Sequence, residues 1–110
     1  MPVSDKNVDT ALTYLADDPH PLAIAQFNLA TAEATTKQTF ARLFLDSNQT
    51  TVDAKKASAE CHPDHIAAKQ VEANAIMECE RHKRRVDAAK NIIEVYRTQN
   101  ANARAAERIR

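Results

Sequence analysis

The amino-acid sequence predicts an all-α protein: a helical hairpin with a long carboxyl-terminal helix of coiled-coil type, which associates with copies of itself. Three observations lead to this prediction. The 110 residues include no glycine, although tight β-hairpin turns and phosphate-binding loops depend on it. Apolar residues recur at alternating intervals of three and four, which is the period of one helix face. After Pro63, no proline or glycine interrupts the chain.

A single helical domain is expected over residues 1–110, with its first helix over residues 4–17. Ser4 has the short polar side chain that commonly caps the amino terminus of a helix. Two aspartates and two prolines between residues 17 and 21 end this helix. One face of the helix carries its apolar residues, which are Val8, Leu12 and Leu15.

The second helix is expected over residues 21–45. Pro21 suits the first turn of a helix, where its missing N–H group would have no partner. Residues spaced three and four apart then form one seam along this helix: Leu22, Ala25, Leu29, Ala32, Thr36, Thr39 and Leu43. Phe40 and Phe44 lie beside the seam. We expect them to pack against the first helix, and the alternative is a docking patch for a partner.

Two further helices are expected over residues 51–60 and 63–108. Thr50, with Asp53 three residues later, resembles a capping box at the start of the shorter one. Pro63 opens the last helix, whose first 40 or so residues alone span roughly 60 Å at about 1.5 Å per residue. Its seam consists of His65, Ala68, Glu72, Ala75, Cys79, His82, Val86, Ala89, Ile93, Tyr96, Asn100 and Ala103.

The last helix is too long for the second helix to cover. A helix over residues 21–45 covers only about 36 Å of it, and the other two helices are short. Uncovered apolar side chains are therefore expected at Ile92, Ile93, Val95 and Tyr96. Because such a surface favours self-association, the sequence predicts a homo-oligomer built mainly on the last helix. The predicted interface residues are Val86, Ile93 and Tyr96.

The formal net charge of zero conceals a basic carboxyl-terminal segment. Residues 1–50 and residues 51–80 each carry a balance of −3, whereas residues 81–110 carry nine cations and three acids, a balance of +6. Five cations share one edge of the last helix: Lys69, Lys83, Lys90, Arg97 and Arg104. The facing edges of the second helix offer them a single acid, Glu33.

This basic edge predicts binding of a polyanion, and an oligomer would multiply the edge. We expect single-stranded nucleic acid, or a nucleoprotein that contains it, to be the partner. A solvated helix end is the alternative, because the isoelectric point is near 6.9 and the one aromatic residue of the basic segment, Tyr96, lies in the seam. The residues expected to contact phosphate are Lys83, Arg84, Arg85, Lys90, Arg97 and Arg104.

Two cysteines and two histidines could form the ligand set of a structural zinc site. Cys61 pairs by spacing with His65, and Cys79 with His82, but about 21 Å of helix separates His65 from Cys79. One chain therefore cannot close the site, although an antiparallel neighbour could, and no metal ligand is assigned. Cys79 and His82 are also the one candidate pair for nucleophilic catalysis. Because an alanine-lined seam offers them no substrate cavity, we expect no catalytic residue, no cofactor and no small-molecule substrate.

Several stretches of the carboxyl-terminal half are rich in Ala, Glu, Lys and Arg: residues 51–57, an acidic run through Glu72, and residues 92–97 and 100–104. In these stretches the chain resembles small helical proteins encoded by tailed bacteriophages. Some of those proteins are similar to recombination mediators that assemble as rings and load a recombinase on single-stranded DNA. The resemblance implies an accessory role in DNA recombination or replication, with DNA or a recombination or replication protein as the partner.

The alternative function is a helical protein-interaction module, an inhibitor or adaptor of a host protein, without nucleic-acid binding. It would use the acidic first half of the chain or the face formed by Phe40 and Phe44. Either role is expected in the cytoplasm, of the host cell if a phage encodes the protein. No apolar run approaches the roughly 18 residues of a membrane-spanning helix, the first residues lack the pattern of a signal peptide, and two cysteines suit a reducing compartment.

Overall fold

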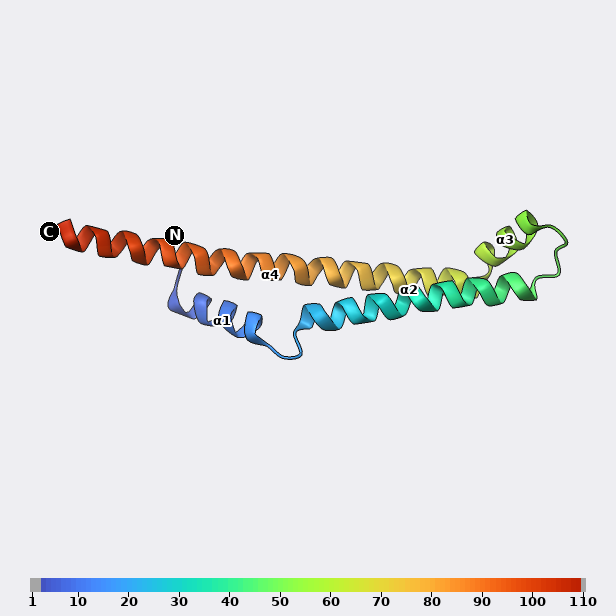
Figure 1. Cartoon of the computed structure of the whole chain (residues 1–110), viewed down its shortest axis with the longest axis horizontal. Coiled ribbons are helices and arrows are strands. Elements are labelled where there is room, and N and C mark those ends of the chain that lie inside the picture. Colours follow the sequence, from blue (N-terminus) through green and yellow to red (C-terminus); the bar gives the residue numbers. More distant parts are fainter. Residues whose placement is uncertain (1–2, 110) are drawn as a thin grey trace. The chain divides into compact units, whose positions relative to one another are not determined.

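The computed structural model describes residues 3–109 of the chain. It contains four helices in this range and no strand: α1 (Asp5–Ala16), α2 (Pro21–Asp46), α3 (Val52–Cys61) and α4 (Pro63–Ile109) (Figure 1). The predicted all-α fold class, with its long carboxyl-terminal helix, is confirmed. Each helix begins and ends within one residue of its expected bounds.

Contacts along the backbone divide the chain into two compact units. The first unit consists of the amino-terminal segment through Leu22 together with α4 from Arg81 onward. The second unit is Ala23–Glu80, which contains most of α2, all of α3 and the first part of α4. Each unit has its own packing contacts, so the single domain expected over residues 1–110 stays a prediction.

In the second unit, α2 and the first part of α4 form an antiparallel hairpin. The Thr36 hydroxyl donates a hydrogen bond to the backbone carbonyl of Ala68, at 3.4 Å. Further along α2, the Arg42 guanidinium lies 3.1 Å from the Asp64 carboxylate near the start of α4. Residues later in α2 therefore face residues earlier in α4, which is the arrangement expected of a hairpin.

The predicted seams of α2 and α4 are buried, as expected. Every seam residue of α2 is buried or half-buried, and so is every seam residue of α4 from His65 through Tyr96. The last two predicted seam residues, Asn100 and Ala103, are exposed. The most buried members are small, namely Ala25, Ala32, Ala68, Cys79 and Ala89. The helices are therefore held mainly by the close approach of small side chains.

The start of α3 differs by one residue from the expected capping position. Thr51, and not Thr50, is the N-cap, and its hydroxyl accepts a hydrogen bond from the backbone N–H of Ala54. No acid stands at the position that would complete a capping box, so the Thr51 hydroxyl satisfies the N–H of Ala54 without a reciprocal bond from a carboxylate. Ala59 of α3 is 1% exposed, so this side of α3 is packed within the second unit.

Phe40 and Phe44 belong to the second unit, and the expectation that they pack against the first helix is wrong. Their rings stack at 6.3 Å between centroids. Phe40 meets the edge of the His65 ring at 5.6 Å, and the ammonium group of Lys55 lies 5.7 Å from the centre of the Phe44 ring. The pair therefore joins α2 to α3 and α4, and both rings are half-buried.

In the first unit, α1 packs along the second part of α4. Ala11 and Tyr14 of α1 meet Ala89 of α4 in a buried cluster, on which four half-buried residues pack: Leu15, Val86, Ile92 and Ile93. The Ser4 hydroxyl accepts from the N–H of Asn7 at 3.2 Å, so the expected N-cap of α1 is confirmed. The expected face of α1 is partly wrong, because Val8, Ala11 and Tyr14 are buried whereas Leu12 is 49% exposed.

Candidate nucleic-acid interface

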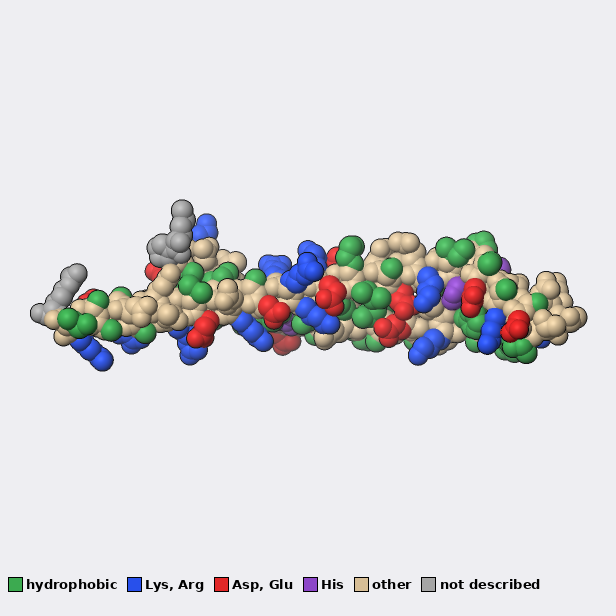
Figure 2. Space-filling view, turned by 90° about the horizontal axis from the view of Figure 1, so that it is seen from above, with side chains coloured by type: hydrophobic (Ala, Val, Ile, Leu, Met, Phe, Trp, Pro, Cys, Tyr) green, Lys and Arg blue, Asp and Glu red, His purple; other side chains and the backbone are tan. Residues whose placement is uncertain are grey.

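Four of the predicted phosphate contacts lie along one side of α4. Lys83, Lys90, Arg97 and Arg104 are seven residues apart, so each is turned by only about 20° from the one before. Arg108 follows Arg104 by four residues and is turned from it by about 40° in the opposite sense, so it lies near the middle of this row. We call these five residues the basic flank. All five side chains are exposed, and Figure 2 shows Lys and Arg side chains spaced along the carboxyl-terminal part of α4.

The sequence reasoning missed Arg108 as a member of this surface. Its signal was present in the spacing, because a residue four positions beyond Arg104 must lie on the same side of an unbroken helix. The predicted site followed the seven-residue spacing of the edge cations, which ends at Arg104, and Arg108 does not fit that spacing. The helix extends to Ile109, so Arg108 belongs to the flank.

Arg84 and Arg85 lie on other sides of α4 than the basic flank, and their expected contact with phosphate stays a prediction. Consecutive residues of a helix point about 100° apart, so Arg84 and Arg85 turn away from Lys83 by about 100° and 200°. The guanidinium of Arg85 lies 4.1 Å from the centre of the Tyr14 ring, a cation–π contact. Arg85 therefore helps to hold α1 on α4, while Arg84 is exposed on another side of the helix.

Three acids of α4 lie next to the basic flank. Asp87 and Glu94 follow Lys83 and Lys90 by four residues, and Glu94 lies 3.8 Å from the guanidinium of Arg97. The side chains of this ion pair are 75% and 71% exposed, and such surface pairs contribute little because water screens them. Glu80, three residues before Lys83, adjoins the start of the flank. Five cations and three acids therefore leave a formal excess of +2 along this side of α4.

Tyr14 anchors α1 to the face of α4 that adjoins the basic flank. Its hydroxyl lies 3.0 Å from Nδ1 of His82, and the two rings are nearly parallel at 6.4 Å between centroids. His20 approaches the same ring edge-on at 4.9 Å. A buried tyrosine packs through its apolar ring, and the polar partner of its hydroxyl fixes the orientation of that ring. The contact fixes which side of α4 is covered.

The amino-terminal end of α1 reaches as far along α4 as Gln99. The Tyr96 hydroxyl donates to the carboxylate of Asp5 at 2.9 Å, and the backbone N–H of Val3 donates to Oε1 of Gln99 at 3.1 Å. Beyond this point, every residue of α4 from 100 through 109 is exposed. The last ten residues of α4 are therefore not packed against other described parts of the chain.

Residues of α1 partly cover the predicted oligomer residues, and the sequence did not indicate this covering. Val86 and Ile93 pack on the Ala11 and Tyr14 cluster, and Tyr96 is half-buried beside Asp5. The expectation that this stretch stands uncovered is wrong for Ile92, Ile93 and Tyr96, because α1 lies over it. The role of Val86, Ile93 and Tyr96 in an oligomer stays a prediction.

The cysteines and histidines do not gather into a metal site within residues 3–109. No group of three or more His, Cys, Asp and Glu side chains in this range is arranged to hold a metal ion. Cys61 is exposed, whereas Cys79 is 2% exposed. A buried thiol lacks the partial exposure that a reactive thiolate needs, and His82 is engaged with Tyr14.

Comparison of the chain with models of known families, with curated proteins and with solved structures finds no match. Among the helices of residues 3–109, none is both long enough and apolar enough to cross a membrane.

Proposed function

We propose that this protein is a non-enzymatic nucleic-acid-binding protein that grips the phosphate backbone through the basic flank of α4. The role we propose is that of an accessory factor in DNA recombination or replication, as the resemblance to phage proteins suggests, acting in the cytoplasm. The flank offers Lys83, Lys90, Arg97, Arg104 and Arg108, and single-stranded DNA is the proposed ligand. Contact along the flank does not require Arg84 or Arg85, which lie on other sides of α4.

The observation that supports this proposal most is the separation of apolar and cationic sides on the second part of α4. The apolar side is already occupied by α1, through Tyr14 and its cluster. The neighbouring side carries five exposed cations and three acids. A surface of exposed cations that are not needed for packing is suited to a polyanion, because each phosphate contact releases a condensed counterion.

The same geometry supports backbone contact in preference to base recognition. Proteins that hold single strands by stacking use exposed aromatic rings. Tyr96, the one aromatic residue of α4 beyond Arg81, is half-buried, and its hydroxyl is bonded to Asp5. We therefore expect little dependence on base sequence and a strong dependence on salt.

The test is fluorescence anisotropy of a labelled single-stranded 30-mer at 50 mM and 200 mM salt. If four flank cations contact phosphates, affinity should fall by about 50-fold over this interval, since each contact to a single strand adds about 0.7 to the logarithmic salt slope. The double variant Arg97→Glu/Arg104→Glu should bind more weakly at 50 mM and should lose only about 7-fold, because about two contacts remain.

The matched control is Lys37→Glu/Lys56→Glu, which makes the same change of charge at exposed residues of the second unit. It should bind like the unchanged protein. No binding at 50 mM salt, or equal loss from both double variants, would contradict the proposal, and the first outcome would favour a protein-interaction module. A labelled duplex of equal length in parallel tests whether single strands are preferred.

A further inference from the structure

The two longest helices, α2 and α4, each begin with a proline that follows a histidine. At the start of α2, Nδ1 of His20 accepts a hydrogen bond from the backbone N–H of Leu22 at 3.0 Å. At the start of α4, Nδ1 of His62 accepts one from the backbone N–H of Asp64 at 3.0 Å. Because proline has no N–H group, each imidazole takes the first free N–H of its helix. The two histidines therefore act as the N-caps of α2 and α4.

These caps differ chemically from the caps of the shorter helices. Ser4 and Thr51 cap α1 and α3 through hydroxyl groups, which do not titrate near neutral pH. An imidazole accepts through Nδ1 only when it is neutral and its proton is on Nε2. A protonated imidazole has an N–H at both nitrogens, and it places a positive charge at the positive end of the helix dipole. Histidine ordinarily gains its proton between about pH 8 and pH 5, so the stabilisation from such a cap is lost as the pH falls through this range.

The groups around His20 all belong to the first unit. The ring of Tyr14 meets the imidazole edge-on at 4.9 Å between centroids, and the guanidinium of Arg85 lies over the same tyrosine ring. Asp17 and Asp18 precede His20 in the loop. The residue whose N–H is capped has an apolar side chain, so it offers an imidazolium no carboxylate in place of the lost contact.

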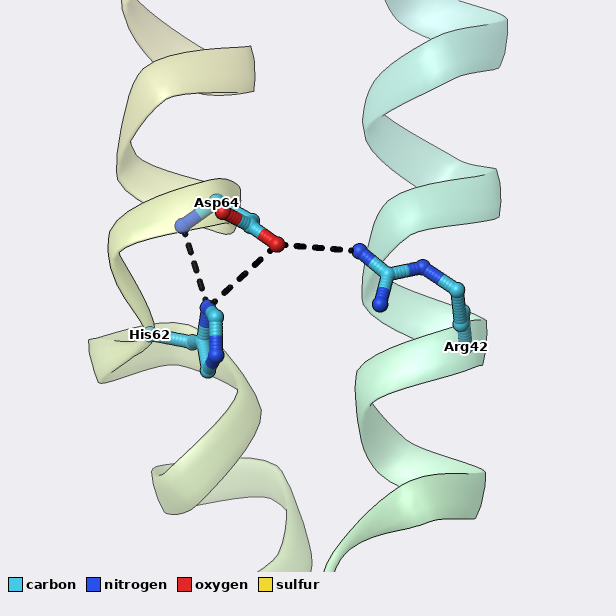
Figure 3. Close-up of polar contacts among 3 residues, drawn as sticks. All are labelled: Arg42, His62 and Asp64. Atoms are coloured by element: carbon cyan, nitrogen blue, oxygen red, sulfur yellow. Dashed lines mark hydrogen bonds and ion pairs between the residues drawn. The ribbon is translucent and has the colours of Figure 1, made fainter.

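His62 differs because the residue that it caps carries a carboxylate. Nδ1 of His62 lies 3.9 Å from Oδ2 of Asp64, and the same oxygen lies 3.1 Å from the guanidinium of Arg42 (Figure 3). Asp46 of α2 lines the same hollow as His62 and Arg42. One nitrogen cannot accept from the N–H and donate to the carboxylate at once, so a proton on Nδ1 exchanges the first contact for the second. The carboxylate offsets part of the lost cap.

We propose that the starts of α2 and α4 are proton-sensitive. Neutral His20 and His62 hold the first turns of the two helices, and a proton on either imidazole releases its cap. The imidazolium of His62 then pairs with Asp64, so the larger loss belongs to His20. None of these residues belongs to the basic flank, and the proposal therefore does not depend on nucleic-acid binding.

The first test compares two substitutions of His20 by urea unfolding, followed by circular dichroism, at pH 8 and pH 5. His20→Asn keeps an acceptor that does not titrate, whereas His20→Ala removes the acceptor. At pH 8, His20→Ala should lower the equilibrium constant for folding about 5-fold, and His20→Asn should leave it within about 2-fold of the unchanged protein. At pH 5, His20→Ala should match the unchanged protein, and His20→Asn should exceed both about 5-fold.

The same two substitutions at His62 test the part that Asp64 plays. At pH 5, the advantage of His62→Asn over the unchanged protein should be smaller than the advantage of His20→Asn. An advantage as large as the one at position 20 would contradict the pairing of the imidazolium with Asp64.

A second measurement detects the caps without any substitution. Long-range ¹H–¹⁵N spectra of the unchanged protein at pH 8 should show His20 and His62 with the proton on Nε2 and none on Nδ1. A proton on Nδ1 of either residue at pH 8 would overturn the proposal for that helix. A loss from His20→Ala that is equal at pH 8 and pH 5 would overturn the proton sensitivity itself.

Discussion

Tyr14 shows how a single side chain determines which surface of α4 is available. It is 7% exposed, its hydroxyl meets His82, and its ring meets Arg85. Through these contacts it covers one side of α4 and engages the guanidinium of Arg85, which stays exposed. The basic flank is an exposed cationic side of α4 that α1 leaves open.

Removing the Tyr14 hydroxyl should therefore weaken the first unit measurably. We expect Tyr14→Phe to lower the free energy of unfolding by about 1 kcal/mol, the net contribution of one hydrogen bond. Tyr14→Ala should lower it by about 3 kcal/mol or more, because the ring is lost from a packed cluster as well. Urea unfolding followed by circular dichroism measures both changes.

Tyr96→Phe is the control for that comparison. It also removes a hydroxyl, the one bonded to Asp5, but Asp5 is exposed and Tyr96 is half-buried. Its effect should stay within about 0.5 kcal/mol, as is usual for changes near the surface. Equal effects of Tyr14→Phe and Tyr96→Phe would show that the contact with His82 is not the anchor described above.

At the level of the helix, α4 has a packed part and a part without neighbours. From Val86 through Tyr96 it packs against α1, whereas residues 100–109 are all exposed. An isolated helix end of ten residues is marginal in water, because helix stability comes mainly from packing. The end of α4, with Arg104 and Arg108, should therefore open locally far more often than the packed part.

Hydrogen exchange measures this difference directly. Backbone amides of residues 100–109 should exchange at least about 10-fold faster than those of Ala89 through Tyr96, since local opening there costs little free energy. If the proposed function is correct, saturating single-stranded DNA at low salt should slow exchange in residues 100–109. Equal protection of the two stretches in the free protein would contradict the description of an unsupported helix end.

The helices and their buried faces could be predicted because they depend only on local chemistry. Spacings of three and four in α4 indicated Ala68, Cys79 and Ala89 as buried, and these residues are buried. The partner of each face could not be predicted in the same way. In α1 the sets Val8, Leu12, Leu15 and Val8, Ala11, Leu15 fit a helix face equally well, so the covering of α4 by α1 was missed.

The candidate site was predictable to the same extent. The seven-residue spacing of Lys83, Lys90, Arg97 and Arg104 follows from the sequence once the helix is known to be unbroken. The contact of Arg85 with Tyr14 depends on where α1 lies, which no local pattern encodes.

For the molecule as a whole, the charges are distributed unevenly although they sum to zero. The second unit, residues 23–80, carries five cations and eight acids, a formal charge of −3, whereas residues 81–110 carry +6. The account therefore assigns contact with a polyanion to the second part of α4.

The measurement that tests the central claim most directly is a titration of the ¹⁵N-labelled protein with a single-stranded 30-mer at 50 mM salt, followed by amide chemical shifts. The account predicts shifts between Lys83 and Arg108, largest along the basic flank and reversed at 200 mM salt, with none at Lys37, Lys55 or Lys56. An unchanged spectrum, or shifts centred on α2 and α3, would contradict it.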